Sequence, residues 1–253
     1  MVGSFTPQKQ NFHPGGILLS VQGLKPDEAA YNPAVIIQKN ENKIAQGSKI
    51  IAARVESLHS SWLDPKTYDP RVLFFTRQAN ALVPIPNTPI FYQSEDPWAT
   101  WLTGKTGNPQ LLFGMVAVDF TTVKPVITSK LYLAASVQEL DAGSPVAEIR
   151  NMKDIRVAQL SDGRVAVFTR PTFGEAAPGR IGFAIINNIA DIEKAVQSAP
   201  LLKFKINKNA KIGANEAFVL PPANGNEFIR VFCHVAETDP IPENGREIFD
   251  FEK

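Results

Sequence analysis

Four short polar motifs stand at nearly even intervals along the chain, and this regularity constrains the fold more than any other feature. They are Tyr31-Asn32-Pro33, Glu95-Asp96-Pro97, Lys153-Asp154-Ile155 and Asn215-Glu216-Ala217. The spacing indicates a repeat of about 60 residues, beginning near residues 31, 94, 152 and 213. Repeats of this kind stack against their neighbours, because one small unit cannot bury its own apolar faces.

Each motif is followed by a run rich in Val, Ile, Leu and Phe that is bounded by turn residues, the pattern of half-buried strands. These runs are Lys49–Val55, Gln110–Val118, Arg164–Thr169 and Glu227–Val235, with further strands expected at Ile17–Val21 and Arg180–Ile186. The one helix expected is Asp191–Ser198, with Asp191 as its cap. The pattern predicts an all-β, single-domain propeller over residues 1–253, in which the first strand of each blade lies at the central axis. A two-sheet, lectin-like β-sandwich remains open as an alternative.

The charge balance disfavours polyanionic partners. Lys plus Arg total 26 and Asp plus Glu total 25, so neither nucleic acid nor a membrane surface is an expected partner. The single cysteine, Cys233, excludes an internal disulfide, and its place in an apolar strand predicts a buried, inert thiol. The first ten residues lack a secretion-signal pattern, so a cytoplasmic location is expected.

Carboxylates in the repeated motifs are the candidate catalytic groups. Asp96, Asp154 and Glu216 would converge at the mouth of the funnel, with Glu56 on the second strand of the first repeat. Carboxylates held close together have divergent pKa values, so one can hold a proton while another stays ionised. Glycosyl transfer needs this division of labour. Equally, such acids could simply bond turn amides.

Basic and aromatic residues beside these acids are the candidate substrate contacts. Side chains alternate along a strand, so Arg54 shares a face with Glu56, and Arg156 shares one with Asp154. Such pairs are either structural ion pairs or clamps for a phosphate or sugar carboxylate. Among Trp62, Trp98 and Trp101, the best candidate for stacking on a sugar is Trp98, because it follows Glu95-Asp96-Pro97. The full set of predicted substrate contacts is Arg54, Glu56, Glu95, Trp98, Lys153, Arg156, Arg170, Asn215 and His234.

Other chemistries find no support in the sequence. The three histidines, His13, His59 and His234, lack metal-ligand spacing, so no metal site is predicted. No nucleotide-binding glycine motif or nucleophile elbow occurs in a strand-to-helix context, so no cofactor is expected.

The motifs together resemble an uncharacterised family, domain of unknown function 1861, which is related to five-bladed propeller glycosidases and glycoside phosphorylases. The resemblance extends from about Ile17 to about Ala236 and is most specific at Lys153-Asp154-Ile155-Arg156 and Phe168-Thr169-Arg170-Pro171. It implies a five-bladed β-propeller of the glycosidase type with a polar funnel at the axis and carbohydrate as ligand. Five blades of this length need about 300 residues, so we expect about four blades, with a short polar tail at residues 237–253.

Two functions follow as hypotheses. The first is a glycosidase-like or glycoside-phosphorylase-like propeller that binds or cleaves a small glycan or sugar phosphate, with Asp96 as base, Asp154 as tuning carboxylate and Glu216 as acid. The second is a noncatalytic carbohydrate-binding or scaffold propeller, favoured if the acids are already paired with arginines. An incomplete ring would also expose apolar blade faces, which would favour a homo-oligomer.

Overall fold

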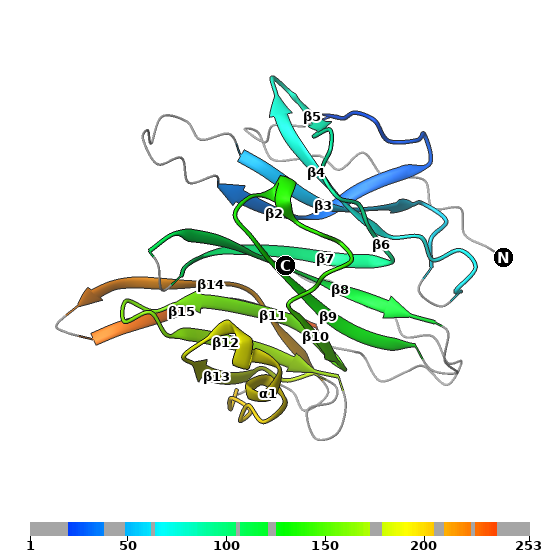
Figure 1. Cartoon of the computed structure of the whole chain (residues 1–253). Coiled ribbons are helices and arrows are strands. Elements are labelled where there is room, and N and C mark those ends of the chain that lie inside the picture. Colours follow the sequence, from blue (N-terminus) through cyan, green and yellow to red (C-terminus); the bar gives the residue numbers. More distant parts are fainter. Residues whose placement is uncertain are drawn as a thin grey trace, which may run out of the picture.

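The structure is a computed structural model that describes residues 20–37, 49–61, 64–104, 107–120, 125–172, 179–204, 210–223 and 226–236. These residues form four sheets with little helix, and all strand pairs but one are antiparallel, which confirms the all-β prediction. The sheets follow one another along the chain as blades of a β-propeller (Figure 1). The polar tail at 237–253 lies outside the described residues.

The first blade is the largest of the four sheets. Strands β2 to β5 pair in sequence order, β6 pairs with β4, and β1 runs parallel to β5. Their bounds are β1 (Ser20–Val21), β2 (Glu28–Ile37), β3 (Lys49–Ser57), β4 (Arg71–Gln78), β5 (Ala81–Pro84) and β6 (Phe91–Tyr92). Of the strand predicted at Ile17–Val21, only its last two residues fall in the described part of the chain.

The three later blades become progressively narrower. The second has four strands, the third has three and the fourth has two in the described residues. Their bounds are β7 (Ser94–Thr103), β8 (Pro109–Asp119), β9 (Val126–Ala134) and β10 (Ala147–Arg150); β11 (Met152–Gln159), β12 (Val165–Pro171) and β13 (Gly182–Ile186); and β14 (Lys211–Ala223) and β15 (Asn226–Ala236). The predicted strands therefore exist, with ends that differ by a few residues.

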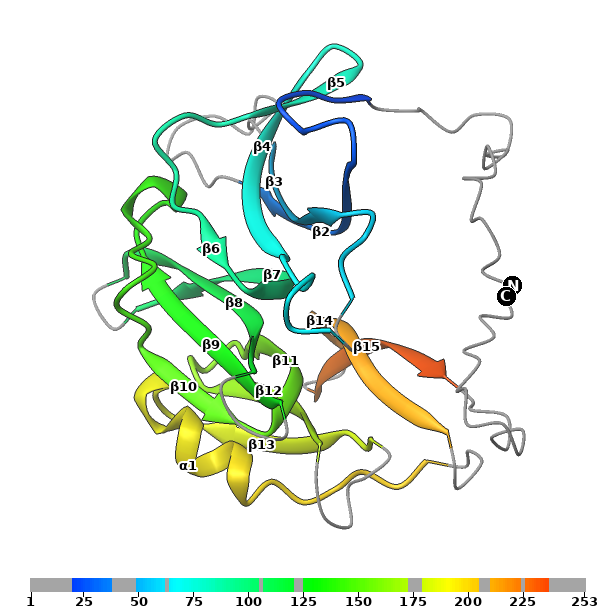
Figure 2. The same cartoon turned by 90° about the vertical axis from the view of Figure 1, so that its right-hand side faces the viewer.

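Strands β2, β7, β11 and β14 lie toward the centre of the molecule. Strand β2 packs against β7, β7 against β11, and β11 against β14. Figure 2 shows these four strands gathered at the middle, with the outer strands radiating away from it. All four sequence motifs lie on these inner strands, so the repeat in the sequence corresponds to one blade in the structure.

Apolar side chains fill the spaces between successive blades. Phe74 and Phe91 from the first blade pack against Phe113 from the second, where the rings of Phe74 and Phe113 are 5.2 Å apart. A second cluster joins the second and third blades and includes Leu131, Ile155 and Val167. This packing fixes the angle between blades and so positions the inner strands.

Two local predictions need correction. The predicted helix is present as α1 (Ile192–Gln197) with Asp191 at its N-cap position, but the Asp191 side chain makes no capping hydrogen bond. A 3₁₀ turn (Ile189–Asp191) precedes the helix, and its capping side chain, Asn188, accepts a hydrogen bond from the amide of Ala190. A second 3₁₀ turn spans Val137–Glu139. Cys233 is exposed because β15 has one partner strand, although partial desolvation still raises the pKa of its thiol.

Candidate functional site

A β-bulge occurs at the sequence motif on each inner strand. The register shifts between Tyr31 and Ala34, between Glu95 and Trp98, between Lys153 and Arg156, and between Ala214 and Glu216. A bulge leaves a residue unpaired and re-aims its side chain. Each sequence motif therefore marks a β-bulge, which turns polar side chains out of the sheet.

Three bulge residues adopt the left-handed conformation that non-glycine residues rarely use. The φ angles are 48° at Asn32, 52° at Asp96 and 48° at Asp154. Asn and Asp tolerate this region better than other side chains, and strain of this kind is concentrated at functional sites. The same strain at the same place in three successive blades indicates a shared role.

The first two blades are joined through Asp96 and Arg54. Asn32 Nδ2 donates a hydrogen bond to Asp96 Oδ1 at 2.6 Å. The Arg54 guanidinium lies 2.9 Å from Glu56 Oε2, 2.8 Å from Glu95 Oε2 and 3.9 Å from Asp96 Oδ1. One arginine therefore contacts three carboxyl groups drawn from two blades.

Glu95 extends the network into the third blade. Its Oε1 lies 2.8 Å from Lys153 Nζ, and Tyr68 Oη donates to its Oε2 at 3.4 Å. Ser60 Oγ donates to Glu56 Oε2 at 3.1 Å. Neither Tyr68 nor Ser60 is predicted from the sequence, because both lie between β3 and β4 and belong to no repeated motif.

Asp154 joins the third blade to the fourth. Its Oδ2 lies 2.9 Å from Arg170 Nε and 3.6 Å from His234 Nε2, and only 8% of its side chain is exposed. On the other side of the imidazole, His234 Nδ1 lies 2.6 Å from Asn215 Oδ1. A Cβ atom at Gly213 would lie 2.1 Å from Asp154 Oδ2 and 2.5 Å from His234 Cε1, so this contact requires a glycine.

Arg156, on β11 of the third blade, makes a further contact with the fourth blade. Its Nε donates to the carbonyl of Asn215 at 2.5 Å, and it interacts electrostatically with both Asp154 and Glu216. Its guanidinium also stands over the ring of Trp98, 5.8 Å from the ring centroid.

The role predicted for Trp98 is wrong. Only 5% of the residue is exposed, and it belongs to the apolar core, so a sugar cannot stack on it. Its ring fills the space over Gly114, where a Cβ atom would lie 2.2 Å away. The Trp98 ring instead packs against the guanidinium of Arg156. Of the other tryptophans, Trp101 donates to the carbonyl of Ile37 and Trp62 lies outside the described residues.

Desolvation shifts several pKa values in the network. Burial raises the pKa of Glu56 from 4.5 to about 7, and the negative charge of Glu95 adds to this effect. Burial also raises the pKa of Glu216, while it lowers that of His234. Glu56 is therefore able to hold a proton near neutral pH, and desolvation shifts the pKa of Glu216 in the same direction.

The shift at Glu56 predicts a pH dependence of stability. Because the folded protein holds this proton more tightly than the unfolded chain, the contribution is present below pH 4.5 and is lost as the pH rises through about 7. We expect Glu56→Gln to flatten the decline in the free energy of unfolding between these values. Urea unfolding at a series of pH values measures this, with Glu139→Gln as a surface control. An unchanged pH profile in Glu56→Gln would contradict the assignment.

The structure gathers the predicted residues of all four blades at the inner strands. Their direct contacts form two groups, one around Arg54 and one around Asp154, and the electrostatic interaction of Arg156 with Asp96 links the two groups into one network. Trp98 lies in the apolar core against Arg156. The network contains the predicted catalytic residues Asp96, Asp154 and Glu216 and the predicted contacts Arg54, Glu56, Glu95, Lys153, Arg156, Arg170, Asn215 and His234. Within the described residues, no cluster of three or more His, Cys, Asp or Glu side chains is arranged to hold a metal ion. Likewise, no helix in the described part of the chain has the length and apolar character needed to cross a membrane.

Comparison with known families identifies the chain. The sequence model for the protein of unknown function DUF1861 matches residues 9–249. The chain belongs to this family. The resemblance carried by the motifs is thereby confirmed, and the four bulges lie within the region that the DUF1861 model covers.

Two solved structures from Leishmania mexicana are similar to this DUF1861 protein. One is MPT-4, a mannose phosphorylase from Leishmania mexicana in complex with phosphate ion, with 25% identity and a TM-score of 0.67, covering 92% of this chain and 64% of that protein. Another is MPT-1, a GDP-Man-dependent mannosyltransferase from the same organism, with 24% identity and a TM-score of 0.68, covering 92% of this chain and 65% of that protein. The chain thus spans less than two thirds of either protein. No match was found among curated proteins.

Proposed function

We propose that the network at the inner strands binds a small glycan or sugar phosphate and catalyses glycosyl transfer to water or phosphate. The observation that carries this proposal is the set of strained bulges on successive blades, which aim Asn32, Asp96 and Asp154 into one charged network. The similarity to a mannose phosphorylase supports a sugar as the ligand.

The acids of the network have environments suited to different roles. Desolvation raises the pKa of Glu216, so it would donate the proton to the leaving oxygen as the glycosidic bond breaks. Asp96, held by Asn32, would accept the proton from the attacking water, and Asp154 would tune the charge beside it. In inverting enzymes the acid and base lie about 6.5–9.5 Å apart, which leaves room for that water.

The cations of the network also suit phosphate as the attacking group. Four side chains are permanently charged, Arg54, Lys153, Arg156 and Arg170. The fork of a guanidinium group matches the geometry of an oxyanion.

One observation favours a noncatalytic sugar-binding site as the alternative. Asp154 is already paired with Arg170, and Arg54 binds Glu56, Glu95 and Asp96. Carboxylate and guanidinium groups that bind each other are not free to act on a reacting sugar. In this case the network would recognise a sugar without cleaving it.

A single substitution tests the catalytic proposal. We expect Asp154→Asn to lower the turnover of aryl mannosides by about 10²-fold or more, with or without phosphate, the range typical for loss of a charged group at a reacting centre. Turnover is measured by release of the aryl alcohol, with a panel of other aryl glycosides run in parallel. Asp162→Asn is the matched control, because Asp162 forms an exposed pair with Arg164 and contacts no residue of the network.

The outcome separates the two functions. Loss of turnover in Asp154→Asn, with Asp162→Asn unchanged, supports catalysis at the network. Unchanged turnover in Asp154→Asn would end that assignment. If the wild-type protein binds mannose in calorimetry and cleaves no glycoside, the noncatalytic function holds instead.

A further inference from the structure

One edge of the Arg54 guanidinium is occupied by a single oxygen atom of Glu56. Arg54 Nη2 donates a hydrogen bond to Glu56 Oε2 at 2.9 Å, and Arg54 Nε donates to the same oxygen at 3.3 Å. A guanidinium edge with two N–H donors binds oxyanions in a bidentate way. Glu56 therefore occupies a part of Arg54 that a phosphate or sulfate ion could use.

The rest of the Arg54 guanidinium is held independently of Glu56. Its Nη1 lies 2.8 Å from Glu95 Oε2, and its Cζ stands over the ring of Tyr31, 5.0 Å from the ring centroid. Arg54 would thus keep its orientation if Glu56 released the Nε and Nη2 donors. Both side chains reach the surface, because Arg54 is 15% exposed and Glu56 is 13% exposed.

The two oxygens of Glu56 have unequal surroundings. Its Oε2 accepts from both Arg54 donors and from Ser60 Oγ at 3.1 Å. Its Oε1 has no hydrogen-bond or ion-pair partner within the described part of the chain. A proton can therefore be added at Oε1 without breaking any of these contacts, and it removes the negative charge that holds the Arg54 edge.

Charge favours a proton in this part of the network. Three carboxyl groups, those of Glu56, Glu95 and Asp96, have Arg54 and Lys153 as their paired cations. When all three are ionised, the acids exceed the cations by one, and a second anion is repelled. A proton on Glu56 removes this excess.

The environment of Glu56 places its titration near neutral pH. The other charged and titratable side chains that act on it are Arg54 on its own strand, Tyr68 and Asp69 before β4, and Glu95 and Asp96 on β7. Burial raises the pKa of Glu56 to about 7, the hydrogen bond from Ser60 opposes this shift, and the charges of the three acids add to it. Burial also raises the pKa of Tyr68, which stays neutral.

We infer that Glu56 controls an oxyanion site on Arg54: with a proton on its carboxyl group it yields the Nε–Nη2 edge to a free phosphate ion, and as a carboxylate it keeps that edge occupied. The inference rests on the proposed function in taking phosphate as the attacking group. Oxyanion binding and proton uptake by Glu56 are then coupled, so each favours the other.

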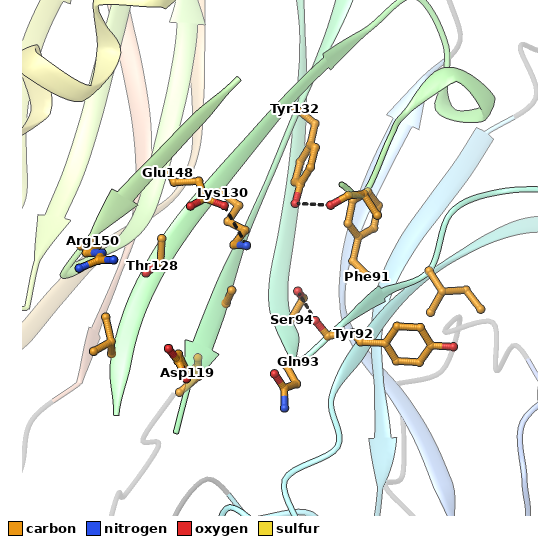
Figure 3. Close-up of a pocket in the computed structure, with 15 residues that line it drawn as sticks. Phe91, Tyr92, Gln93, Ser94, Asp119, Thr128, Lys130, Tyr132, Glu148 and Arg150 are labelled. Carbon is orange, nitrogen blue, oxygen red and sulfur yellow. Dashed lines mark hydrogen bonds and ion pairs between the residues drawn. The ribbon is translucent and has the colours of Figure 1, made fainter. Parts of the chain in front are cut away.

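A cavity between the first and second blades is a second place where an anion could meet cations. It has a volume of about 540 Å³, lies between β6 and the face of β8, β9 and β10, and includes Lys130 and Arg150 in its lining (Figure 3). Lys130 Nζ lies 2.9 Å from Glu148 Oε1. None of the lining residues belongs to the network, so a substitution of Arg150 distinguishes the two places.

Sulfate binding at two pH values tests the inference, because sulfate stays a dianion over a range in which phosphate changes its charge. We expect the wild type to bind sulfate about 30-fold more weakly at about pH 8.5 than at about pH 5.5, which is the change in the neutral fraction of a group with a pKa of about 7. Glu56→Gln keeps a neutral group, so at both pH values it should bind as the wild type does at the lower one. The surface control Glu139→Gln should follow the wild type. Isothermal titration calorimetry measures the binding, and buffers of different ionisation enthalpy should show proton uptake at the higher pH in the wild type and none in Glu56→Gln.

Two arginine variants locate the bound sulfate. Arg54→Lys keeps the positive charge that the carboxyl groups need but lacks an edge with two fixed donors. Its sulfate binding at the lower pH should be weaker by about tenfold or more, as expected for loss of a hydrogen bond to a charged group. Arg150→Gln, at the cavity of Figure 3, should bind sulfate as the wild type does.

Each outcome decides the point. A pH dependence that persists in Glu56→Gln would overturn the inference and would assign the titration to another group, such as His234. Sulfate binding that is lost in Arg150→Gln and kept in Arg54→Lys would also overturn it, and so would a wild type that binds no sulfate at either pH.

Failure of the inference and failure of the proposed function give different results. Sulfate binding that depends on Glu56 and Arg54 as expected supports the inference even if no glycoside is cleaved. Turnover of aryl glycosides by a protein that binds no sulfate would leave the proposed function standing and the inference overturned.

Discussion

Replacing Arg170 by Met is expected to lower the free energy of unfolding by about 3–5 kcal/mol, the usual loss when one partner of a buried ion pair is removed. Arg170 Nε lies 2.9 Å from Asp154 Oδ2, and their side chains are 15% and 8% exposed. Without the guanidinium, the Asp154 carboxylate would remain buried without a directly paired cation, with the His234 imidazole at 3.6 Å and the electrostatic attraction of Arg156 as its remaining partners. Urea unfolding at pH 7 measures the change.

A double variant separates loss of charge pairing from loss of packing. Adding Asp154→Asn to Arg170→Met removes the stranded charge, so the double variant should be more stable than Arg170→Met alone. Arg164→Met, which breaks the exposed pair with Asp162, should cost less than about 1 kcal/mol. If Arg170→Met were no more harmful than Arg164→Met, Asp154 would not be a buried, paired charge.

Replacing Phe113 by Ala is expected to cost about 3–5 kcal/mol, because truncating a fully buried aromatic leaves a cavity. Phe113 is 0% exposed, and its ring centroid lies 5.2 Å from that of Phe74 and 5.6 Å from that of Phe91. These rings hold the second blade against the first. The substitution should therefore also weaken sugar binding at the network, because it loosens the blades that carry Arg54 and Asp96.

An exposed phenylalanine gives the matched control. Phe228 on β15 is 53% exposed, so Phe228→Ala should change the free energy of unfolding by less than about 1 kcal/mol. Thermal or urea unfolding of both variants measures the contrast. Equal losses in Phe113→Ala and Phe228→Ala would contradict the account of how the blades pack.

The sequence was informative where the backbone needs a particular residue type. A bulge with positive φ favours Asn or Asp, so the three strained positions carried a recurring polar signal that periodicity could detect. The apolar runs likewise predicted the strands, since strand patterning is local. For this reason the inner-strand residues Asp96 and Asp154 could be selected before the fold was known.

The partners of these residues could not be predicted, because they depend on the angle between blades. Nothing local indicates that Arg54 reaches Glu95 in the next blade, or that Tyr68 lies against that carboxylate. The burial of Trp98, which was predicted to stack on a sugar, could not be predicted for a related reason. Its burial depends on the absence of a side chain at Gly114, on the neighbouring strand.

The most direct test of the central claim is a crystal structure of the protein soaked with mannose and inorganic phosphate. If the bulges of the four blades build one sugar site, ordered density should lie within hydrogen-bond distance of Asp96, Asp154 and Arg156 together. Sugar or phosphate bound only elsewhere on the molecule, with these side chains still paired among themselves, would contradict the claim.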